Sequence, residues 1–406
     1  MADVYAISKA HHKILILGGG TAGISVASRL AKAKQSDVAI VDPSTKHYYQ
    51  PLWTLVGGGR APLAKSEREE SSVIPKGVKW IQDAAAEIDP EARVVTTANG
   101  KTISYDYLIV CPGIQLDWNQ IPGVRETLGK NGLSSNYEFQ LAPKTWEFIQ
   151  NTKKGTAVFT MPSGPIKCAG APQKIAYLAC DYWRKQGVLK DIEVILAVPT
   201  PKIFGVPEFA EPLMGAIKRY GIDLRTESEV IEVNPDAKEA VIINRAGGAD
   251  EKYTVGYEMM HFVPPQSAPD WIKYSPLAVQ DAKGYVDINK NTMQHNKWSN
   301  IFALGDAGSS PNSKTGAAIR KQAPVVVENL LAVIAGKPLA GEYGGYSSCP
   351  ITTARNKMVL AEFDYTMKPT PSIPIINTKK ERYDMWLLKR YGLPFMYWNL
   401  MLKGKV

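Results

Sequence analysis

A glycine-rich turn between two apolar strands constrains the fold of this chain more than any other feature. Residues 13–17 form a short apolar run that favours a buried parallel strand, and residues 37–41 form a second one. Between them, Gly18, Gly20 and Gly23 match the pattern G-x-G-x-x-G and precede a helical pattern. Strand, turn, helix and strand follow one another within about 30 residues, which predicts a complete βαβ unit.

This arrangement is typical of a dinucleotide site. The first glycine permits the tight turn, the second lets the backbone approach a pyrophosphate, and the third lets helix and strand pack closely. The helix N-terminus supplies N–H donors and a positive dipole end. Asp42 ends the second strand, where an acidic side chain accepts hydrogen bonds from ribose hydroxyls. A purely structural glycine turn would lack this flanking context, so we predict that a dinucleotide binds here.

Two later segments favour FAD as the dinucleotide. An apolar strand covers 106–110, and a further strand over 300–304 runs into Gly305 and Asp306. A strand that ends in Gly-Asp is the second fingerprint of two-domain flavoproteins, in which the Asp meets the ribityl and phosphate region of FAD. Gly-Asp alone would indicate only a turn, so the prediction of FAD depends on all the segments together.

The same segments divide the chain. A length of 406 residues suggests two or three domains. We predict an α/β fold with two Rossmann-like dinucleotide-binding-type domains, the FAD/NAD-linked reductase fold, and a C-terminal membrane-associating region. The predicted ranges are 1–113 with 286–340 for a discontinuous FAD-binding domain, 114–285 for the second domain, and 341–406 for the C-terminal region.

The second predicted domain lacks a phosphate-binding turn of its own. Strands over 156–160 and 193–197 flank a helix over 173–186. In a pyridine-nucleotide reductase the first strand would run into another G-x-G-x-x-G, but here it runs into 161–172, which has three prolines and two widely spaced glycines. Such a loop cannot form the turn. We therefore expect an NAD(P)H-type domain without its cofactor site, and a flavin that another donor reduces.

The four cysteines have different surroundings. Cys168 occupies the interrupted loop beside Lys167 and just before a helix, and both a cation and a helix N-terminus favour the reactive thiolate. Cys349 falls in a glycine-rich segment that we expect to be a loop, where a redox role and simple packing are open alternatives. Cys111, at a strand end, and Cys180, in a helical pattern, are expected to be small buried hydrophobes.

Four longer segments resemble sulfide:quinone oxidoreductase, a family of flavoproteins that oxidise hydrogen sulfide and pass the electrons to membrane quinone. The similarity is greatest to the subgroup typified by the mitochondrial enzymes, and it extends over nearly the whole chain. The segments are His47–Gly57, Pro165–Lys174, Tyr346–Pro350 followed by Val359–Tyr365, and Leu393–Asn399. The resemblance implies that Cys168 and Cys349 form a redox pair over the flavin.

The fingerprints and the resemblance together define the expected cofactor site. Gly18, Gly20, Gly23 and Gly305 belong to the two fingerprints. The resemblance implies further FAD contacts from Thr21, Ala22, Asp42, Gln50, Ala85, Asp306, Lys314, Thr315, Gly316 and Ala317. No metal site is expected.

The resemblance also implies a reaction. Hydrosulfide attacks the bridge between the two cysteines, as in thiol–disulfide exchange, and Cys349 keeps the extra sulfur as a persulfide. Cys168 leaves as a thiolate and reduces FAD, and a thiol or other sulfur nucleophile removes the persulfide sulfur. One alternative is an NADH:quinone oxidoreductase of the same superfamily, which the missing second fingerprint disfavours. Another is a non-enzymatic binding module with a flavoprotein fold.

Charge and hydropathy favour a membrane surface as a partner. The chain has 48 Lys and Arg against 39 Asp and Glu, a formal charge of +9, and this surplus attracts anionic partners. Residues 385–406 contain five aromatic and four basic residues and no acid, which predicts two short interfacial helices separated at Gly392–Pro394. Packing of these helices on the protein's own core is the alternative. The Lys and Arg are dispersed, so no nucleic-acid partner is expected.

The N-terminal residues indicate where the chain operates. Residues 1–13 contain neither the apolar segment of a signal peptide nor an Arg-rich transit pattern. No charge-free run approaches the roughly 20 apolar residues of a spanning helix. We expect a peripheral membrane protein of the bacterial cytoplasmic membrane or the mitochondrial inner membrane, without a signal peptide in this chain. A homo-oligomer is compatible with the sequence.

Overall fold

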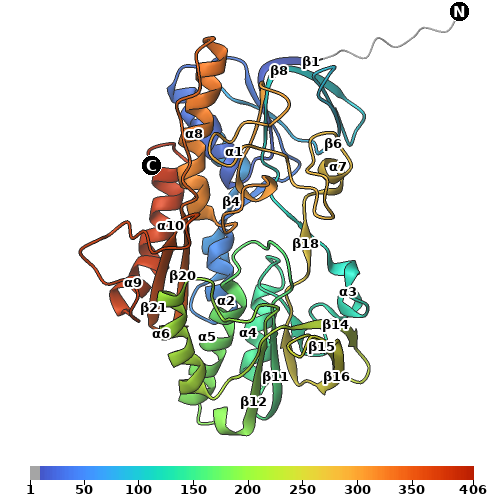
Figure 1. The fold of residues 1–406 in the computed structure, drawn as a ribbon, viewed down its shortest axis with the longest axis vertical. Coiled ribbons are helices and arrows are strands. Elements are labelled where there is room, and N and C mark those ends of the chain that lie inside the picture. The colour runs from blue at the N-terminus through green and yellow to red at the C-terminus, as the bar shows by residue number, and fades with distance from the viewer. Residues whose placement is uncertain (1–9) are drawn as a thin grey trace, which may run out of the picture.

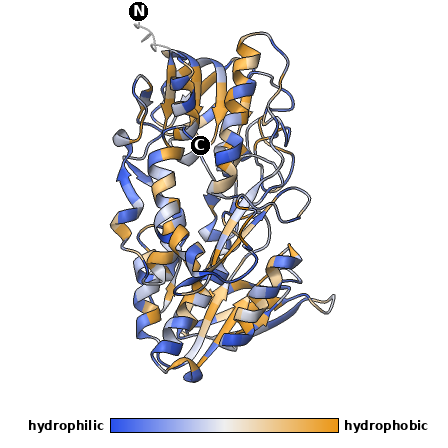
Figure 2. Cartoon of the chain, turned by 90° about the vertical axis from the view of Figure 1, so that its left-hand side faces the viewer, coloured by the Kyte–Doolittle hydropathy of each residue, from blue (hydrophilic) through white to orange (hydrophobic). Residues whose placement is uncertain are grey.

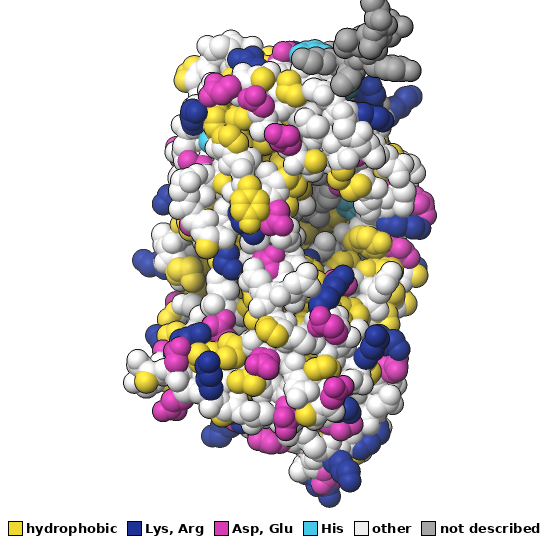
Figure 3. Space-filling view, turned by 90° about the vertical axis from the view of Figure 1, so that its right-hand side faces the viewer, with side chains coloured by type: hydrophobic (Ala, Val, Ile, Leu, Met, Phe, Trp, Pro, Cys, Tyr) yellow, Lys and Arg dark blue, Asp and Glu magenta, His cyan; other side chains and the backbone are white. Residues whose placement is uncertain are grey.

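A computed structural model describes residues 10–406 and contains two larger sheets, one in the upper and one in the lower half of Figure 1. The first is mixed, with β6 (Ala85–Asp89) and β7 (Val94–Thr97) antiparallel, and the second is parallel. Residues 1–9 lie outside the described residues. They include most of the segment in which no targeting signal is expected and the start of the first predicted domain. Figure 2 shows that hydrophobic residues predominate in the strands of both sheets. Figure 3 shows Lys and Arg side chains interspersed with Asp and Glu on the face seen there.

The first sheet has seven strands and contains the glycine-rich turn at the end of its central strand β1. The strand order is β5-β2-β1-β8-β7-β6, and β19 pairs with the end of β8 beside β7. β1 is parallel to both β2 and β8, and its residues 14–17 are almost completely buried, as expected for a central strand. The bounds are β1 Ala10–Leu17, β2 Val38–Val41, β5 Lys79–Ile81, β6 Ala85–Asp89, β7 Val94–Thr97, β8 Thr102–Val110 and β19 Ile301–Ala303.

The second sheet has five parallel strands in the order β10-β17-β11-β12-β13. Its bounds are β10 Leu133–Ser134, β11 Gly155–Thr160, β12 Ile192–Ala197, β13 Asp223–Arg225 and β17 Met259–His261. A three-stranded antiparallel sheet, β14 Ser228–Asn234, β15 Glu239–Asn244 and β16 Glu251–Gly256, lies beside it. The two-stranded pair β9 Gln115–Leu116 and β18 Gln266–Ser267 lies between the two halves.

Helices follow the strands in the order expected for Rossmann-like units. α1 Thr21–Lys32 follows β1 and packs against α8 Gly316–Ile334, while α5 Ala171–Lys185 follows β11. The other helices of at least eight residues are α4 Ala142–Asn151 and α6 Pro207–Tyr220. The parallel strands of the two sheets with their intervening helices confirm the predicted α/β fold with two Rossmann-like units.

The C-terminal region packs on both halves. The hairpin β20 Ser347–Ala354 and β21 Lys357–Phe363 contacts α5 and contributes to the core of the second sheet. The last helical segments are α9 Tyr383–Leu387, η7 Leu388–Gly392, α10 Leu393–Met396 and η8 Tyr397–Met401, and residues from η8 join the core of the first sheet.

The expectation of two separate helices at the C-terminus is wrong. Gly392 has helical dihedrals (φ −69°, ψ −47°), and the helical run continues through Pro394 into η8. η7 and η8 are π turns, and η7 ends at Gly392, two residues before Pro394. A proline ring clashes with the carbonyl one turn before it in a regular helix, and a widened turn provides the space. One continuous helix therefore replaces the predicted pair.

Candidate functional site

A cavity of about 270 Å³ gathers most of the predicted site residues, and both halves of the molecule line it. Its walls come from the turn after β1, the ends of β8 and β19, the loop before α5, the start of α8 and the C-terminal helix. Of the predicted residues, Gly20, Thr21, Ala22, Gln50, Cys168, Gly305, Asp306, Lys314, Thr315, Gly316 and Ala317 line the cavity.

The turn after β1 has the geometry that a pyrophosphate requires. Gly18 has φ +108°, and a Cβ there would lie 2.6 Å from the carbonyl oxygen of Cys111. A Cβ on Gly23 would lie 1.8 Å from the carbonyl oxygen of Gly18, so only glycine allows this close packing. The space above Gly20 is open, and no side chain of residues 10–406 caps the N-terminus of α1. The helix N–H groups therefore face the cavity as donors for an anion.

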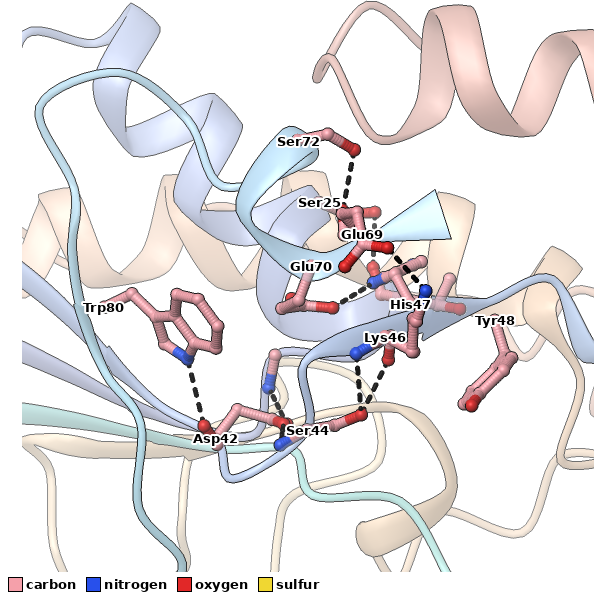
Figure 4. Close-up of polar contacts among 12 residues, drawn as sticks. Ser25, Asp42, Ser44, Lys46, His47, Tyr48, Glu69, Glu70, Ser72 and Trp80 are labelled. Carbon is pink, nitrogen blue, oxygen red and sulfur yellow. Dashed lines mark hydrogen bonds and ion pairs between the residues drawn. The ribbon is translucent and has the colours of Figure 1, made fainter. Parts of the chain in front are cut away.

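Five of the predicted residues do not themselves line the cavity: Gly18, Gly23, Asp42, Ala85 and Cys349. Asp42 follows β2, and its carboxylate accepts hydrogen bonds from the backbone N–H of Gly19 (2.6 Å) and of Ser44 (2.8 Å), as Figure 4 shows for this turn. Its position at the strand end beside the turn matches that of a ribose-binding acid. Ala85 begins β6 and pairs with Thr97, on the outer part of the same sheet.

The Gly-Asp pair after β19 lies beside the start of α1, where a Cβ on Gly305 would lie 3.5 Å from the Cβ of Ala22. Gly305 has φ +70°, and its N–H donates to the side-chain oxygen of Gln322 in α8 at 2.9 Å. Lys314 donates from Nζ to the carbonyl oxygens of Asp306 (2.8 Å) and Gly308 (2.9 Å), which ties this segment to the start of α8. Burial lowers the pKa of Lys314 to about 8 and raises the pKa of Asp306. The Thr315 side chain caps α8 by accepting from Ala318.

Cys168 lies in the cavity wall in a strained backbone conformation. Its φ is +52°, and its N–H donates to the carbonyl oxygen of Lys314 at 2.8 Å. The Tyr137 hydroxyl donates to the carbonyl oxygens of Lys167 (3.0 Å) and Cys168 (3.3 Å). Lys174, in the first turns of α5, donates from Nζ to Cys168 Sγ at 2.9 Å. This ammonium stabilises a thiolate on Cys168.

Cys349 lies on strand β20, and the expectation of a loop is wrong. It pairs with Ala361 of β21, and Pro350 beside it is tolerated because, among the described strands, β20 pairs with β21 alone and leaves one edge free. The side chain is 1 % exposed. Burial raises the pKa of Cys349 to about 11, and negative charge on Cys168 adds to the shift, whereas Lys174 and the N–H of Gly170 oppose it. Both cysteines are free thiols, and Lys174 acts on each of them.

Lysines around the cavity are the functional residues that sequence reasoning missed or misassigned. Lys167, expected to act on Cys168, instead donates to Gln50 Oε1 at 2.8 Å, and burial lowers its pKa to about 8. Lys174 and Lys389 are 2 % and 4 % exposed. Burial lowers the pKa of Lys389 to about 7, with the charge of Lys174 adding to the effect. The position of Lys174 in the first turns of the helix that follows Cys168 was a usable signal, but no local pattern places Lys389.

The remaining cysteines pack as expected, although one also borders the cavity. Cys180 is completely buried in α5, which confirms it as a core residue. Cys111 is 4 % exposed, lies against the carbonyl oxygen of Gly18, and contributes to the cavity wall. Among residues 10–406, no group of three or more His, Cys, Asp or Glu has the arrangement of a metal site.

Comparisons with known proteins agree with this geometry. Residues 12–322 match the family described as pyridine nucleotide-disulphide oxidoreductase. The mitochondrial sulfide:quinone oxidoreductase of Mus musculus is 43% identical over 400 residues, which is 98% of this chain and 88% of the relative. The mitochondrial sulfide:quinone oxidoreductase of Dictyostelium discoideum is 44% identical over 396 residues, 97% of this chain and 86% of the relative.

A solved structure shares the fold. The crystal structure of sulfide:quinone oxidoreductase from Aquifex aeolicus superimposes with a TM-score of 0.76 at 18% identity, and the match covers 96% of this chain and 92% of the other. The likeness extends over both sheets and the C-terminal region. With the sequence identities above, it means that this chain is an FAD-binding member of the pyridine nucleotide-disulphide oxidoreductases and belongs, within them, to the sulfide:quinone oxidoreductase family.

Proposed function

We propose that this protein oxidises hydrogen sulfide with Cys168 and Cys349 and transfers the electrons through FAD to a membrane quinone. The observation that carries the proposal is that Cys168 lines the cavity that the dinucleotide turn also lines, while Ser348 and Pro350, on either side of Cys349, line it as well. Lys174 donates to Cys168, and Cys349 lies near enough for the charges of Lys174 and Cys168 to act on it. The names of the relatives support the same activity.

The residues around the cavity fit FAD. The open N-terminus of α1 beyond Gly20 suits the pyrophosphate, and Asp42 suits the adenosine ribose. Gln50, Asp306 and the segment 314–317 would hold the flavin half near Cys168. When bound, FAD supplies a group that accepts an electron pair from sulfur and delivers it to quinone in one or two steps.

The sulfide half of the reaction depends on the difference between the two cysteines. In the oxidised enzyme a disulfide joins them; hydrosulfide attacks Cys349 Sγ, the S–S bond breaks, and Cys168 leaves as a thiolate. Lys174 stabilises this leaving group, which makes Cys168 the better leaving thiol. Cys349 keeps the sulfane sulfur as a persulfide within a buried site, 1 % exposed, where water has little access. A thiol or other sulfur nucleophile then accepts this sulfur.

Four lysines, three of them buried, make the site electrostatically suited to anions. Lys167, Lys174, Lys314 and Lys389 all border the cavity. Opposite charges attract more strongly where water is excluded, so hydrosulfide and an anionic sulfur acceptor are favoured there. These lysines also contribute to the positive net charge of the chain, which is formally +9.

The quinone would reach the cavity past the C-terminal helix. Leu393, Met396 and Met401 line the cavity, while Tyr391 and Phe395 of the same helix are 60% and 61% exposed. Exposed aromatic residues beside Lys and Arg are typical of a helix that lies in a membrane interface. Across residues 10–406, no helix has both the length and the hydropathy to span a bilayer. The relatives named mitochondrial favour the mitochondrial inner membrane over a bacterial one.

The proposal is tested by an anaerobic titration of the holoenzyme with sulfide, followed by quinone. Sulfide should bleach the flavin absorbance and quinone should restore it, whereas NADH should do neither. Cys168→Ser should retain FAD but lose the reduction by sulfide, and Cys180→Ser, which changes a cysteine outside the cavity, should behave as wild type. Full bleaching of Cys168→Ser by sulfide would contradict the proposed role of Cys168, and reduction by NADH would favour the alternative enzyme.

The membrane contact is tested on the exposed face of the C-terminal helix. Deletion of the helix would also remove the buried Tyr397 and Trp398, so loss of vesicle binding would not identify the cause. Replacing both Tyr391 and Phe395 with serine should instead reduce sedimentation with anionic lipid vesicles about tenfold, because two interfacial aromatic anchors are lost, and leave bound FAD unchanged. Undiminished vesicle binding would place the membrane contact elsewhere.

A further inference from the structure

The C-terminal helix is joined to the dinucleotide turn by a buried chain of hydrogen bonds. Tyr397 Oη in η8 lies 2.8 Å from Thr21 Oγ1, the first residue of α1, and 2.7 Å from His47 Nε2. His47 Nδ1 lies 3.0 Å from Glu70 Oε2, and Figure 4 shows the side chains of His47 and Glu70 facing each other. The chain of contacts therefore runs from α1 through the C-terminal helix to Glu70.

Glu70 also lies against the dinucleotide turn after β1. Its Oε1 accepts no hydrogen bond within residues 10–406, and it lies 2.9 Å from the position that a Cβ on Gly19 would take. Glu70, His47 and Tyr397 are 1 %, 2 % and 4 % exposed. A carboxylate buried this deeply is costly unless it is paired, and His47 is its partner here. The turn is thus contacted at Gly19 by Glu70 and bonded at Thr21 by Tyr397.

Side chains of α1 also form hydrogen bonds with the backbone of residues 402–406. Ser28 Oγ donates to the carbonyl oxygen of Leu402 at 2.6 Å, and Lys32 Nζ donates to that of Gly404 at 2.9 Å. Arg29 donates to the carbonyl oxygen of Val406. Because α1 begins at the dinucleotide turn, movement of the C-terminal segment away from α1 would disturb both ends of that helix.

We infer that Tyr397, His47 and Glu70 are positioning residues that couple FAD binding to the docking of the C-terminal helix. They hold the turn in the conformation that receives the cofactor, and bound FAD in turn stabilises the docked helix. Such coupling is reciprocal, since each event must favour the other by the same factor. Met396 of the same helix lines the cavity, and Phe395 of that helix is exposed. Binding of FAD would therefore also stabilise the helix that carries the surface proposed to contact the membrane.

The first test compares two tyrosines of the same helix. Tyr397→Phe keeps the ring but removes the hydroxyl, so His47 Nε2 and Thr21 Oγ1 both lose a partner in a buried site. FAD should bind the deflavinated full-length variant about tenfold more weakly, as titration by flavin fluorescence would measure. Tyr391→Phe alters a tyrosine that is 60% exposed and should bind FAD as wild type.

A purely structural role for Tyr397 would give a different result. It would lower the melting temperatures of the FAD-free and FAD-bound forms equally and leave FAD affinity unchanged, and that outcome would overturn the inference. Coupling instead requires that FAD raise the melting temperature of Tyr397→Phe by less than it raises that of Tyr391→Phe.

A second measurement needs no variant. Hydrogen exchange of the wild-type amides over residues 383–401 should slow when FAD is added to the deflavinated protein, because bound FAD favours the docked helix. Equal exchange with and without FAD would overturn the coupling. None of these measurements uses sulfide or quinone, so failure of the proposed activity would leave the inference intact, and the reverse also holds.

Discussion

The loops that follow β1 and β11 have the same topological position in their respective sheets, yet they present different chemistry to one cavity. The loop after β1 spans residues 18–20 and leads directly into α1. The loop after β11 spans 161–170 and carries Cys168 before α5 begins. A short glycine turn brings a helix N-terminus close to a phosphate, whereas the longer loop moves the backbone away and inserts a thiol.

The two helix N-termini are correspondingly used in different ways. Within the part of the chain that the structure describes, no side chain caps α1, so its N–H groups are available to the cofactor. At α5, the N–H of Gly170 acts on Cys349, and Lys174 one turn later donates to Cys168. Both arrangements stabilise negative charge at a helix start, on a phosphate in one case and on sulfur in the other. A dinucleotide-binding unit thus becomes a thiol-activating one through a change of loop.

The largest expected effect is the loss of FAD on a substitution that disrupts the loop after β1, compared with a substitution in the loop after β11 that should retain FAD. In Gly23→Ala the new Cβ would lie 1.8 Å from the carbonyl oxygen of Gly18, so the turn must open and FAD binding should be lost. In Gly170→Ala the new Cβ would meet Ile351 at 3.5 Å, an ordinary contact, and FAD should be retained. The ratio of flavin to protein absorbance after purification measures both. Equal FAD content in the two variants would show that the turn does not hold the cofactor.

The first loop could be predicted from sequence almost completely because its requirements are local. Glycines at fixed spacing, an apolar strand before them and an acid after the next strand all lie within one βαβ unit, and the structure has each element in place. Helix α5 was likewise predicted to within two residues at its start. Local backbone chemistry determines these features.

The second loop and the C-terminal helix could be predicted only in part, because tertiary contacts decide them. Cys168 was identified, but its cationic partner is Lys174 and not the adjacent Lys167. Cys349 was expected in a loop because the sequence around it gives no local strand signal. Its strand, β20, is buried by packing against α5, which is distant in sequence. The helical run through Pro394 depends on a π turn that no sequence pattern signalled.

A smaller effect tests whether α5 activates sulfur. Lys174→Met removes the ammonium that lies 2.9 Å from Cys168 Sγ but keeps most of the side-chain volume. A hydrogen bond to a charged group contributes roughly 1.5–3 kcal/mol, so the rate of flavin reduction by sulfide should fall about 10- to 100-fold while FAD stays bound. In Lys185→Met, which changes a lysine at the exposed end of the same helix, sulfide should reduce the flavin at the wild-type rate. An unchanged rate in Lys174→Met would assign thiolate stabilisation to another group.

The smallest effect concerns the backbone strain that holds Cys168 in place. Left-handed dihedrals at a non-glycine residue cost about 1 kcal/mol or more and persist only where neighbouring contacts enforce them. At Cys168, with φ +52°, those contacts are the carbonyl oxygen of Lys314 and the hydroxyl of Tyr137. Tyr137→Phe removes only the second, so sulfide-driven reduction should slow about threefold to tenfold with FAD content unchanged. A drop as large as that of Lys174→Met would mean that Tyr137 acts on the reacting sulfur directly, and the second loop would then depend on its side chains as strictly as the first depends on its glycines.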